Sequence, residues 1–201
     1  MFSVQRYREI ALAYIRGLER RKAAGGSINR IASVASFFVS RVDSSVDAAL
    51  ESKGEAGAEL LGKVAIANAK VAYGHFANLF GSQQWQALAA EGARPQRLLW
   101  ASTGTKNANY SDVLYVEELI GPATVNTVPP ATLDKFRDHG NVELTLTRGL
   151  ADAHKQLTQL SELGISLDAI TEDLENAGIK SFVEAFDRLL ESIDGKRQAL
   201  S

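Results

Sequence analysis

The sequence contains no cysteine, which excludes a disulfide framework, a thiol nucleophile and a thiolate metal site. It also has little net charge, since 22 basic and 24 acidic residues leave only -2, and nothing would draw nucleic acid or an anionic membrane to it. No apolar run approaches the roughly 20 residues that span a bilayer. Arg6 and Arg8 are not followed by the apolar stretch of a secretion signal. These absences predict a cytoplasmic protein without nucleic-acid or membrane partners.

The composition is that of an ordinary folded domain. Of the 201 residues, 45% are hydrophobic, 23% charged and 7% aromatic, which is typical of a chain that buries a core. We therefore expect a single domain.

Three short segments have the composition of β-strands. Residues 31–39 are rich in β-branched and aromatic residues and are apolar on both faces, which is typical of a buried strand. Residues 97–101, RLLWA, run into a polar loop, and residues 124–127 form a brief third segment. These strands are expected to lie in one sheet.

Helical spacing of apolar residues separates the strands and fills the C-terminal part of the chain. In the first part, helices are expected over 4–18, 60–81, 85–90, 112–119 and 133–138. The tail is expected to hold three more, over 150–160, 167–174 and 182–193, with glycines between them. Strands that alternate with helices predict right-handed crossovers and a parallel sheet. Because three strands cannot close a barrel, the chain is expected to be part of a larger α/β structure.

Several motifs carry little weight. Gly57 and Gly62-Lys63 have the spacing of a phosphate-binding loop, but Val64 follows where a hydroxyl would hold magnesium, and no strand precedes them. The three histidines show no metal-ligand spacing, so no metal site is expected. No cofactor is expected either.

A serine and an arginine at the end of the first strand form a better candidate site. Ser36 and Arg41 belong to the segment SFFVSR, and parallel sheets build their sites at the carboxyl ends of strands. An arginine fork suits a phosphate group, and a serine hydroxyl can donate beside it. The alternative, that Arg41 pairs with Asp43 at the surface, has equal weight.

A second candidate follows the next strand. The loop STGTKN, residues 102–107, has small residues that let backbone amides approach an anion, and one cation, Lys106. Two cationic loops at the same end of neighbouring strands predict a site for a phosphorylated small molecule.

Three segments, residues 31–43, 97–107 and 115–130, together resemble the bacterial type of transaldolase, and the resemblance runs through nearly the whole chain. It implies a class I aldolase fold, here a partial (β/α)8 TIM barrel of about strands 5/6 to 8 with a C-terminal helical extension. Residues 1–201 would be the C-terminal portion of a single barrel domain, with βα units over 1–148 and helices over 149–201. Residues 2–3 resemble the tail of the fifth strand.

The resemblance also implies the chemistry. The family transfers a dihydroxyacetone unit between ketose and aldose phosphates of the pentose phosphate pathway through a lysine Schiff base. Its substrates would be sedoheptulose 7-phosphate, fructose 6-phosphate, glyceraldehyde 3-phosphate and erythrose 4-phosphate. Ser36 and Arg41 match the family's substrate serine and phosphate arginine, and Lys106 lies where a second phosphate-binding cation is supplied.

The Schiff-base lysine belongs to a strand upstream of the matched segments, so Lys106 is not that lysine and no catalytic residue is assigned here. We expect the chain to supply the phosphate-binding half of a transaldolase site and to be inactive alone. One alternative is a module that binds sugar phosphates without turnover. Another is an assembly fragment that completes a barrel with the N-terminal half.

Overall fold

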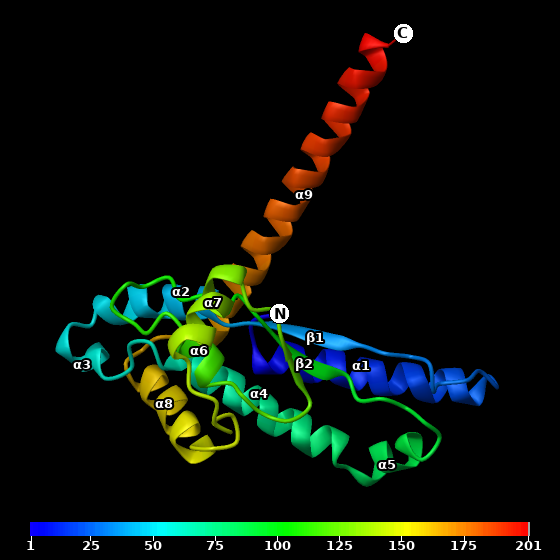
Figure 1. The fold of residues 1–201 in the computed structure, drawn as a ribbon, viewed down its shortest axis with the longest axis horizontal. Helices are drawn as coiled ribbons and strands as arrows, with labels where there is room; N and C mark the ends of the chain where they lie inside the picture. The colour runs from blue at the N-terminus through cyan, green and yellow to red at the C-terminus, as the bar shows by residue number, and fades with distance from the viewer. Residues whose placement is uncertain (201) are drawn as a thin grey trace.

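A computed structural model describes residues 1–200, which form an α/β fold around a small parallel sheet (Figure 1). The strands β1 (Val34–Phe38), β2 (Arg97–Ala101) and β3 (Thr124–Asn126) lie in this order. Val34 lies opposite Arg97, and Leu98 opposite Thr124. All three predicted strands are therefore confirmed, although β1 begins three residues later than expected.

The two faces of the sheet differ in burial because successive side chains of a strand point to opposite sides. One face packs against helices and is almost completely buried, and its residues are Ala35, Phe37, Leu98 and Trp100. On the other face Ser36, Phe38 and Leu99 remain half-buried. The half-buried face is available for a site or for a further part of a fold.

Two long helices, α1 (Val4–Ala23) and α4 (Val64–Phe80), pack on each other and on the buried face of the sheet. The first is capped by Ser3, whose hydroxyl accepts from the Arg6 N–H at 3.2 Å, and it ends before Gly25, which has a φ of +77°. Helix α5 (Gln83–Ala89) follows α4. All three helices agree with the sequence pattern, but α4 begins four residues later than predicted.

Helix α2 (Ser40–Glu51), which follows β1 directly, was not predicted from the sequence. Its buried residues Val42, Val46 and Leu50 are spaced by four, which is a helical signal that the preceding apolar strand obscured. Two single turns of helix follow, α3 (Glu55–Ala58) and α6 (Leu114–Glu117). The longer helix α7 (Pro130–His139) comes after β3.

The tail forms two helices, α8 (Leu150–Glu162) and α9 (Leu167–Ala199), instead of the three predicted. Gly178 does not interrupt α9, because a helical glycine costs only about 1 kcal/mol relative to alanine. Helix α9 begins against α2 and then extends away from the body (Figure 1). Within residues 1–200, no helix is long and apolar enough to cross a membrane.

Met1 lies beside β1 in the manner of one more parallel strand. Its ammonium group donates to the Ser36 carbonyl at 3.2 Å, and its carbonyl accepts from the Phe38 N–H at 3.1 Å. This arrangement agrees with the resemblance of residues 2–3 to the tail of a preceding strand.

Candidate functional site

The loops that carry the candidate residues leave the sheet side by side at the carboxyl ends of β1 and β2. The Val39 N–H donates to the Ala101 carbonyl at 3.0 Å, and the Ser40 N–H donates to the Ser102 carbonyl at 2.9 Å. Both connections therefore begin at the edge where parallel sheets place their sites.

Ser36 and Arg41 lie at this edge. Ser36 is on the half-buried face of β1, two residues before the strand ends. Arg41 is exposed in the first turn of α2, and its guanidinium lies 5.3 Å from the centre of the Phe38 ring. That cation–π contact holds the charge above the end of the strand. The alternative that Arg41 pairs with Asp43 is wrong, because Asp43 is buried and bonds to other partners.

Lys106 lies beside α2, at a different position along the helix from Arg41. It is exposed in the loop after β2, and with Asn107 and Tyr110 it lines a shallow pocket against Asp47 and Glu51 of α2. Arg41 is in the first turn of α2 and Glu51 at its end, so the loop lies along the later part of the helix. The pocket that Lys106 lines does not include Arg41.

Two buried carboxylates attach this loop to α2, and sequence reasoning missed them. The Tyr115 hydroxyl donates to Asp43 Oδ2 at 2.7 Å, and the Tyr110 hydroxyl donates to Asp47 Oδ2 at 2.8 Å. Asp43 and Asp47 are one helical turn apart, which puts both on the same side of α2. The aspartates thus hold both ends of the segment 110–115 against the helix.

The same carboxylates also bind the segment that leads into α4. The Ala65 N–H donates to Asp43 Oδ1 at 3.2 Å, and the Gly62 N–H donates to Asp47 Oδ1 at 3.1 Å. Each aspartate therefore links two distant segments to α2. The segment Gly57 to Lys63 does not form a phosphate-binding loop, because Lys63 precedes α4 and the Gly62 N–H donates to Asp47.

The electrostatics of this network follow from its burial. Burial raises the pKa of the Asp43 carboxyl to about 6, and the charge of Asp47 adds to this, whereas bonds from Tyr115 and Ala65 lower it. Burial, and then the charge of Asp43, raises the pKa of the Tyr115 hydroxyl. Tyr115 therefore stays protonated and remains a donor.

The start of the second loop is conformationally strained. Ser102 has a φ of +54°, which is unfavourable for a residue with a side chain. The next residue, Thr103, is completely buried, and its hydroxyl donates to Asn126 Oδ1 at 2.7 Å. This bond ties the loop to β3, and such strain persists where neighbouring contacts enforce it.

The histidines stay outside this edge. His139 is exposed and bonds to Asp112 at 2.8 Å, and the hydrogen bond to Asp112 raises its pKa. Within residues 1–200, no cluster of three or more metal-ligating side chains occurs.

The fold and this edge define an α/β protein that places polar and cationic side chains at the carboxyl ends of parallel strands. A model of the transaldolase/fructose-6-phosphate aldolase family matches residues 1–193, so the chain belongs to that family. Transaldolase 2 of Nostoc sp. is 48% identical over 213 residues, which cover all of this chain and 56% of that protein. A transaldolase of Saccharopolyspora erythraea is 50% identical, with 96% of this chain and 53% of that protein covered.

Transaldolase 1 of Streptomyces avermitilis is similar to the same extent, at 48% identity over 96% of this chain and 52% of its own length. The chain spans about half the length of the curated relatives it matches.

Proposed function

We propose that this chain provides the phosphate-binding half of a transaldolase, which moves a dihydroxyacetone unit between ketose and aldose phosphates of the pentose phosphate pathway. The observation that carries the proposal is the position of Ser36 and Arg41 at the carboxyl edge, in a chain of the transaldolase family. In this proposal the chain is the C-terminal portion of a single (β/α)8 barrel domain. Its βα units, about strands 5/6 to 8, lie within 1–148 and its C-terminal helices within 149–201, of which residue 201 lies outside the described residues.

In this proposal the chain's own residues bind and orient the substrate. The Arg41 guanidinium receives the sugar's phosphate bidentately, and the Phe38 ring beneath it limits the positions it can adopt. The Ser36 hydroxyl, further along the same face, donates to an oxygen of the sugar. Lys106 lies beside the later part of α2, in a pocket that does not include Arg41, so its positive charge is proposed to act on the phosphate from a distance. Attachment of the phosphate to Arg41 limits the positions of the reacting carbons.

The Schiff-base lysine is proposed to lie outside this chain. Its amine would attack the ketose carbonyl, and the protonated nitrogen would accept electrons as the carbon–carbon bond breaks. None of the residues of β1, β2 or β3 is a lysine. The isolated chain should therefore bind sugar phosphates without catalysing the transfer reaction.

Borohydride trapping tests whether the Schiff-base lysine lies outside this chain. The chain incubated with fructose 6-phosphate and borohydride should gain no covalent sugar, because none of its three strands carries a lysine. Mass spectrometry of the intact chain and of its peptides makes the measurement, with a full-length transaldolase as the labelled control. Reduction of the sugar onto a lysine of this chain would show that it carries its own nucleophile.

Replacement of Arg41 by alanine should weaken the binding of fructose 6-phosphate by about 10- to 100-fold, as expected for the loss of a charge-assisted hydrogen bond. Titration calorimetry at low salt measures the affinity. Arg16→Ala is the matched control, since Arg16 is exposed on α1, and it should bind as the wild type does. Equal affinities of the two variants would contradict the assignment of Arg41.

The second candidate is a module that binds sugar phosphates without any turnover, and the lysine-free strands favour it. A mixture of this chain with the part of a relative that it does not match discriminates the two functions. Transaldolase turnover in the mixture supports the enzyme, whereas tight binding without turnover supports the module.

A further inference from the structure

A hollow at the amino ends of β1 and β2 carries two arginines. It has a volume of about 470 Å³, and we call it the amino-end pocket. Its lining residues are Ala32, Ser33, Val34, Arg94, Pro95 and Arg97. Small-molecule sites usually occupy about 300–1,000 Å³, so the pocket is large enough to hold a small organic molecule.

The amino-end pocket lies at the opposite end of the sheet from Arg41. Val34 and Arg97 lie opposite each other where the two strands begin, and the paired segment ends at Phe38 and Ala101. At about 3.3 Å per residue, the two ends of the strands are roughly 13 Å apart. Arg41 follows the far end, so a phosphate group bound to its guanidinium does not reach the amino-end pocket. The two places are separate sites.

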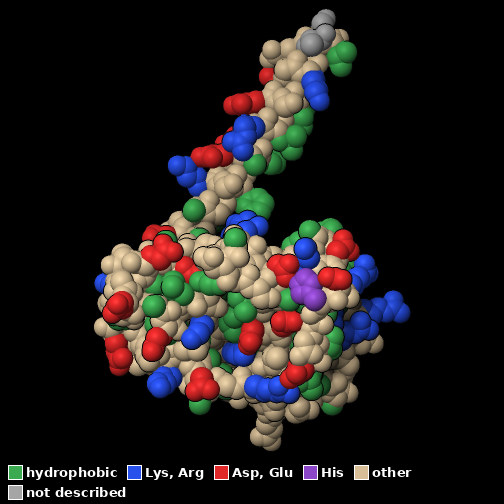
Figure 2. Space-filling model, turned by 60° about the vertical axis from the view of Figure 1, so that its left-hand side comes forward, with side chains coloured by type: hydrophobic (Ala, Val, Ile, Leu, Met, Phe, Trp, Pro, Cys, Tyr) green, Lys and Arg blue, Asp and Glu red, His purple; other side chains and the backbone are tan. Residues whose placement is uncertain are grey.

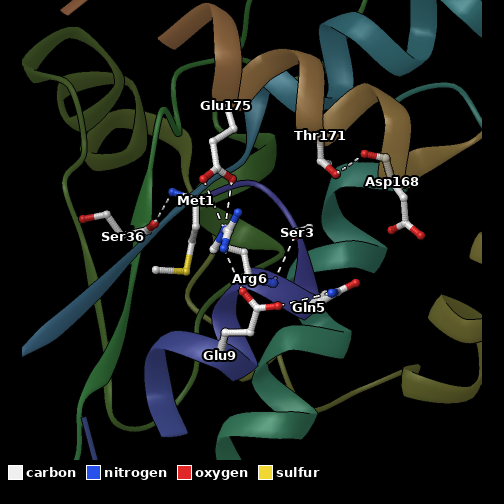
Figure 3. Close-up of polar contacts among 9 residues, drawn as sticks. All are labelled: Met1, Ser3, Gln5, Arg6, Glu9, Ser36, Asp168, Thr171 and Glu175. Carbon is white, nitrogen blue, oxygen red and sulfur yellow. Dashed lines mark hydrogen bonds and ion pairs between the residues drawn. The ribbon is translucent and has the colours of Figure 1, made fainter. Parts of the chain in front are cut away.

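The two arginines of the amino-end pocket, Arg94 and Arg97, are exposed, and neither guanidinium forms an ion pair or hydrogen bond within residues 1–200. Arg6 differs, because the carboxylates of Glu9 and Glu175 contact its guanidinium at 2.8 and 3.2 Å (Figure 3). On the face drawn in Figure 2, acidic and basic side chains lie among one another. The lining of the amino-end pocket in the described chain includes no carboxylate, so its positive charge is available to a ligand.

The Ser33 hydroxyl adds a further donor, and hydrogen bonds fix the walls of the pocket. Gln96 is buried, and its Nε2 donates to Ser33 Oγ at 2.8 Å, which leaves the hydroxyl proton of Ser33 available to a ligand. The Tyr14 hydroxyl donates to the Arg94 carbonyl at 2.8 Å and holds the backbone of the other wall. Two guanidiniums and a hydroxyl suit an oxyanion, and arginine can bind a phosphate group bidentately.

The rest of the lining is apolar. Val34 is 43% exposed, whereas the other four residues of β1 are buried or half-buried. Ala32 is exposed beside it, and Pro95 is half-buried on the opposite wall. An apolar surface next to unpaired cations favours a ligand that carries an apolar group beside its charge. Inorganic phosphate lacks such a group, and a sugar is covered with hydroxyls.

We propose that the amino-end pocket binds a phosphate monoester whose organic part is apolar. Arg94 and Arg97 bind the phosphate oxygens, and the Ser33 hydroxyl donates to one of them. The organic part packs on Val34 and Pro95. Two guanidiniums complement the charge of a phosphate monoester, about -1.5 to -2 at pH 7, better than that of a single carboxylate. This site does not rest on the proposed function.

Titration of the full chain with phenyl phosphate, followed by amide NMR shifts, tests the proposal. The Arg41→Ala chain serves as the background, because it lacks the guanidinium at the other end of the sheet. Phenyl phosphate should shift the amides of residues 32–34 and 94–97 and bind about tenfold more tightly than inorganic phosphate, since its ring covers apolar surface. Arg97→Gln and Arg94→Gln should each weaken binding by about 10- to 100-fold. Arg20→Gln removes the same charge from the exposed last turn of α1 and should leave the affinity within about threefold.

Absence of binding, or shifts confined to the carboxyl ends of the strands, would overturn the proposal. Equal weakening by Arg97→Gln and Arg20→Gln would also overturn it, since a general attraction to positive charge would then explain the binding. Equal affinities for phenyl phosphate and inorganic phosphate would contradict the apolar ligand. The fructose 6-phosphate titration that compares the wild type with Arg41→Ala is a separate measurement. Its failure would contradict the proposed function and leave the amino-end pocket as a site.

Discussion

The free energy of unfolding of the wild-type chain should contain a contribution from Asp43 that is lost between about pH 4 and pH 7. The Asp43 carboxyl has a pKa of about 6 in the folded chain and an ordinary value of 3.8. Between these two pH values the folded chain keeps a proton on Asp43 that the unfolded chain has lost. Stability from this group is thus complete below pH 3.8 and falls as the pH rises through 6. The difference corresponds to about 3 kcal/mol.

Asp43→Asn should remove this pH dependence, because an amide does not ionise. Its carbonyl oxygen can accept from Ala65 as the carboxylate does, and its amide can donate to the Tyr115 oxygen. Urea unfolding of both proteins at pH 4.5 and pH 7 makes the comparison. The exposed Asp134→Asn variant retains Asp43 and should follow the wild type. Parallel pH profiles for Asp43→Asn and the wild type would show that Asp43 does not titrate in this range.

Gly62→Ala should lower the free energy of unfolding by about 2–4 kcal/mol. Gly62 has a φ of +69°, where a side chain costs roughly 1–2 kcal/mol. A Cβ there would also lie 2.9 Å from Cζ of the Tyr110 ring, which must move away. Displacement of the ring would break the bond from Tyr110 to Asp47, so the loop with Lys106 would lose one of its attachments to α2.

Gly25→Ala separates the backbone cost from the clash. Gly25 has a φ of +77°, but a Cβ there would meet no atom within 4 Å. This variant should lose only about 1–2 kcal/mol. Thermal unfolding and tyrosine fluorescence of both variants measure the difference. Equal losses in the two proteins would mean that the Tyr110 ring does not depend on the space beside Gly62.

The sequence predicted the sheet well because each strand is a short apolar run with a clear boundary. The segment 97–101 ends where a serine- and threonine-rich loop begins, and β2 ends at the same residue. Ser36 and Arg41 were also placed correctly at a strand end. The family, which the three longer segments suggested, is confirmed by the match over residues 1–193.

The remaining features depend on contacts that spacing does not reveal. Asp43 and Tyr115 are 72 residues apart in sequence, so nothing in either segment indicates that they meet. Lys106 follows its strand as predicted, but the tyrosine contacts direct its loop along α2. The single helix α9 was divided at Gly178, because sequence alone does not show whether a glycine ends a helix or lies within it.

The bond between the Met1 ammonium group and the Ser36 carbonyl determines where added sequence would go. A residue joined ahead of Met1 turns that amine into a peptide N–H, which can keep the same acceptor at Ser36. The direction of Met1 then guides the extension backward along β1, past Val34. An affinity tag fused there would therefore occupy the sheet margin, whereas a tag fused after α9 would leave it clear.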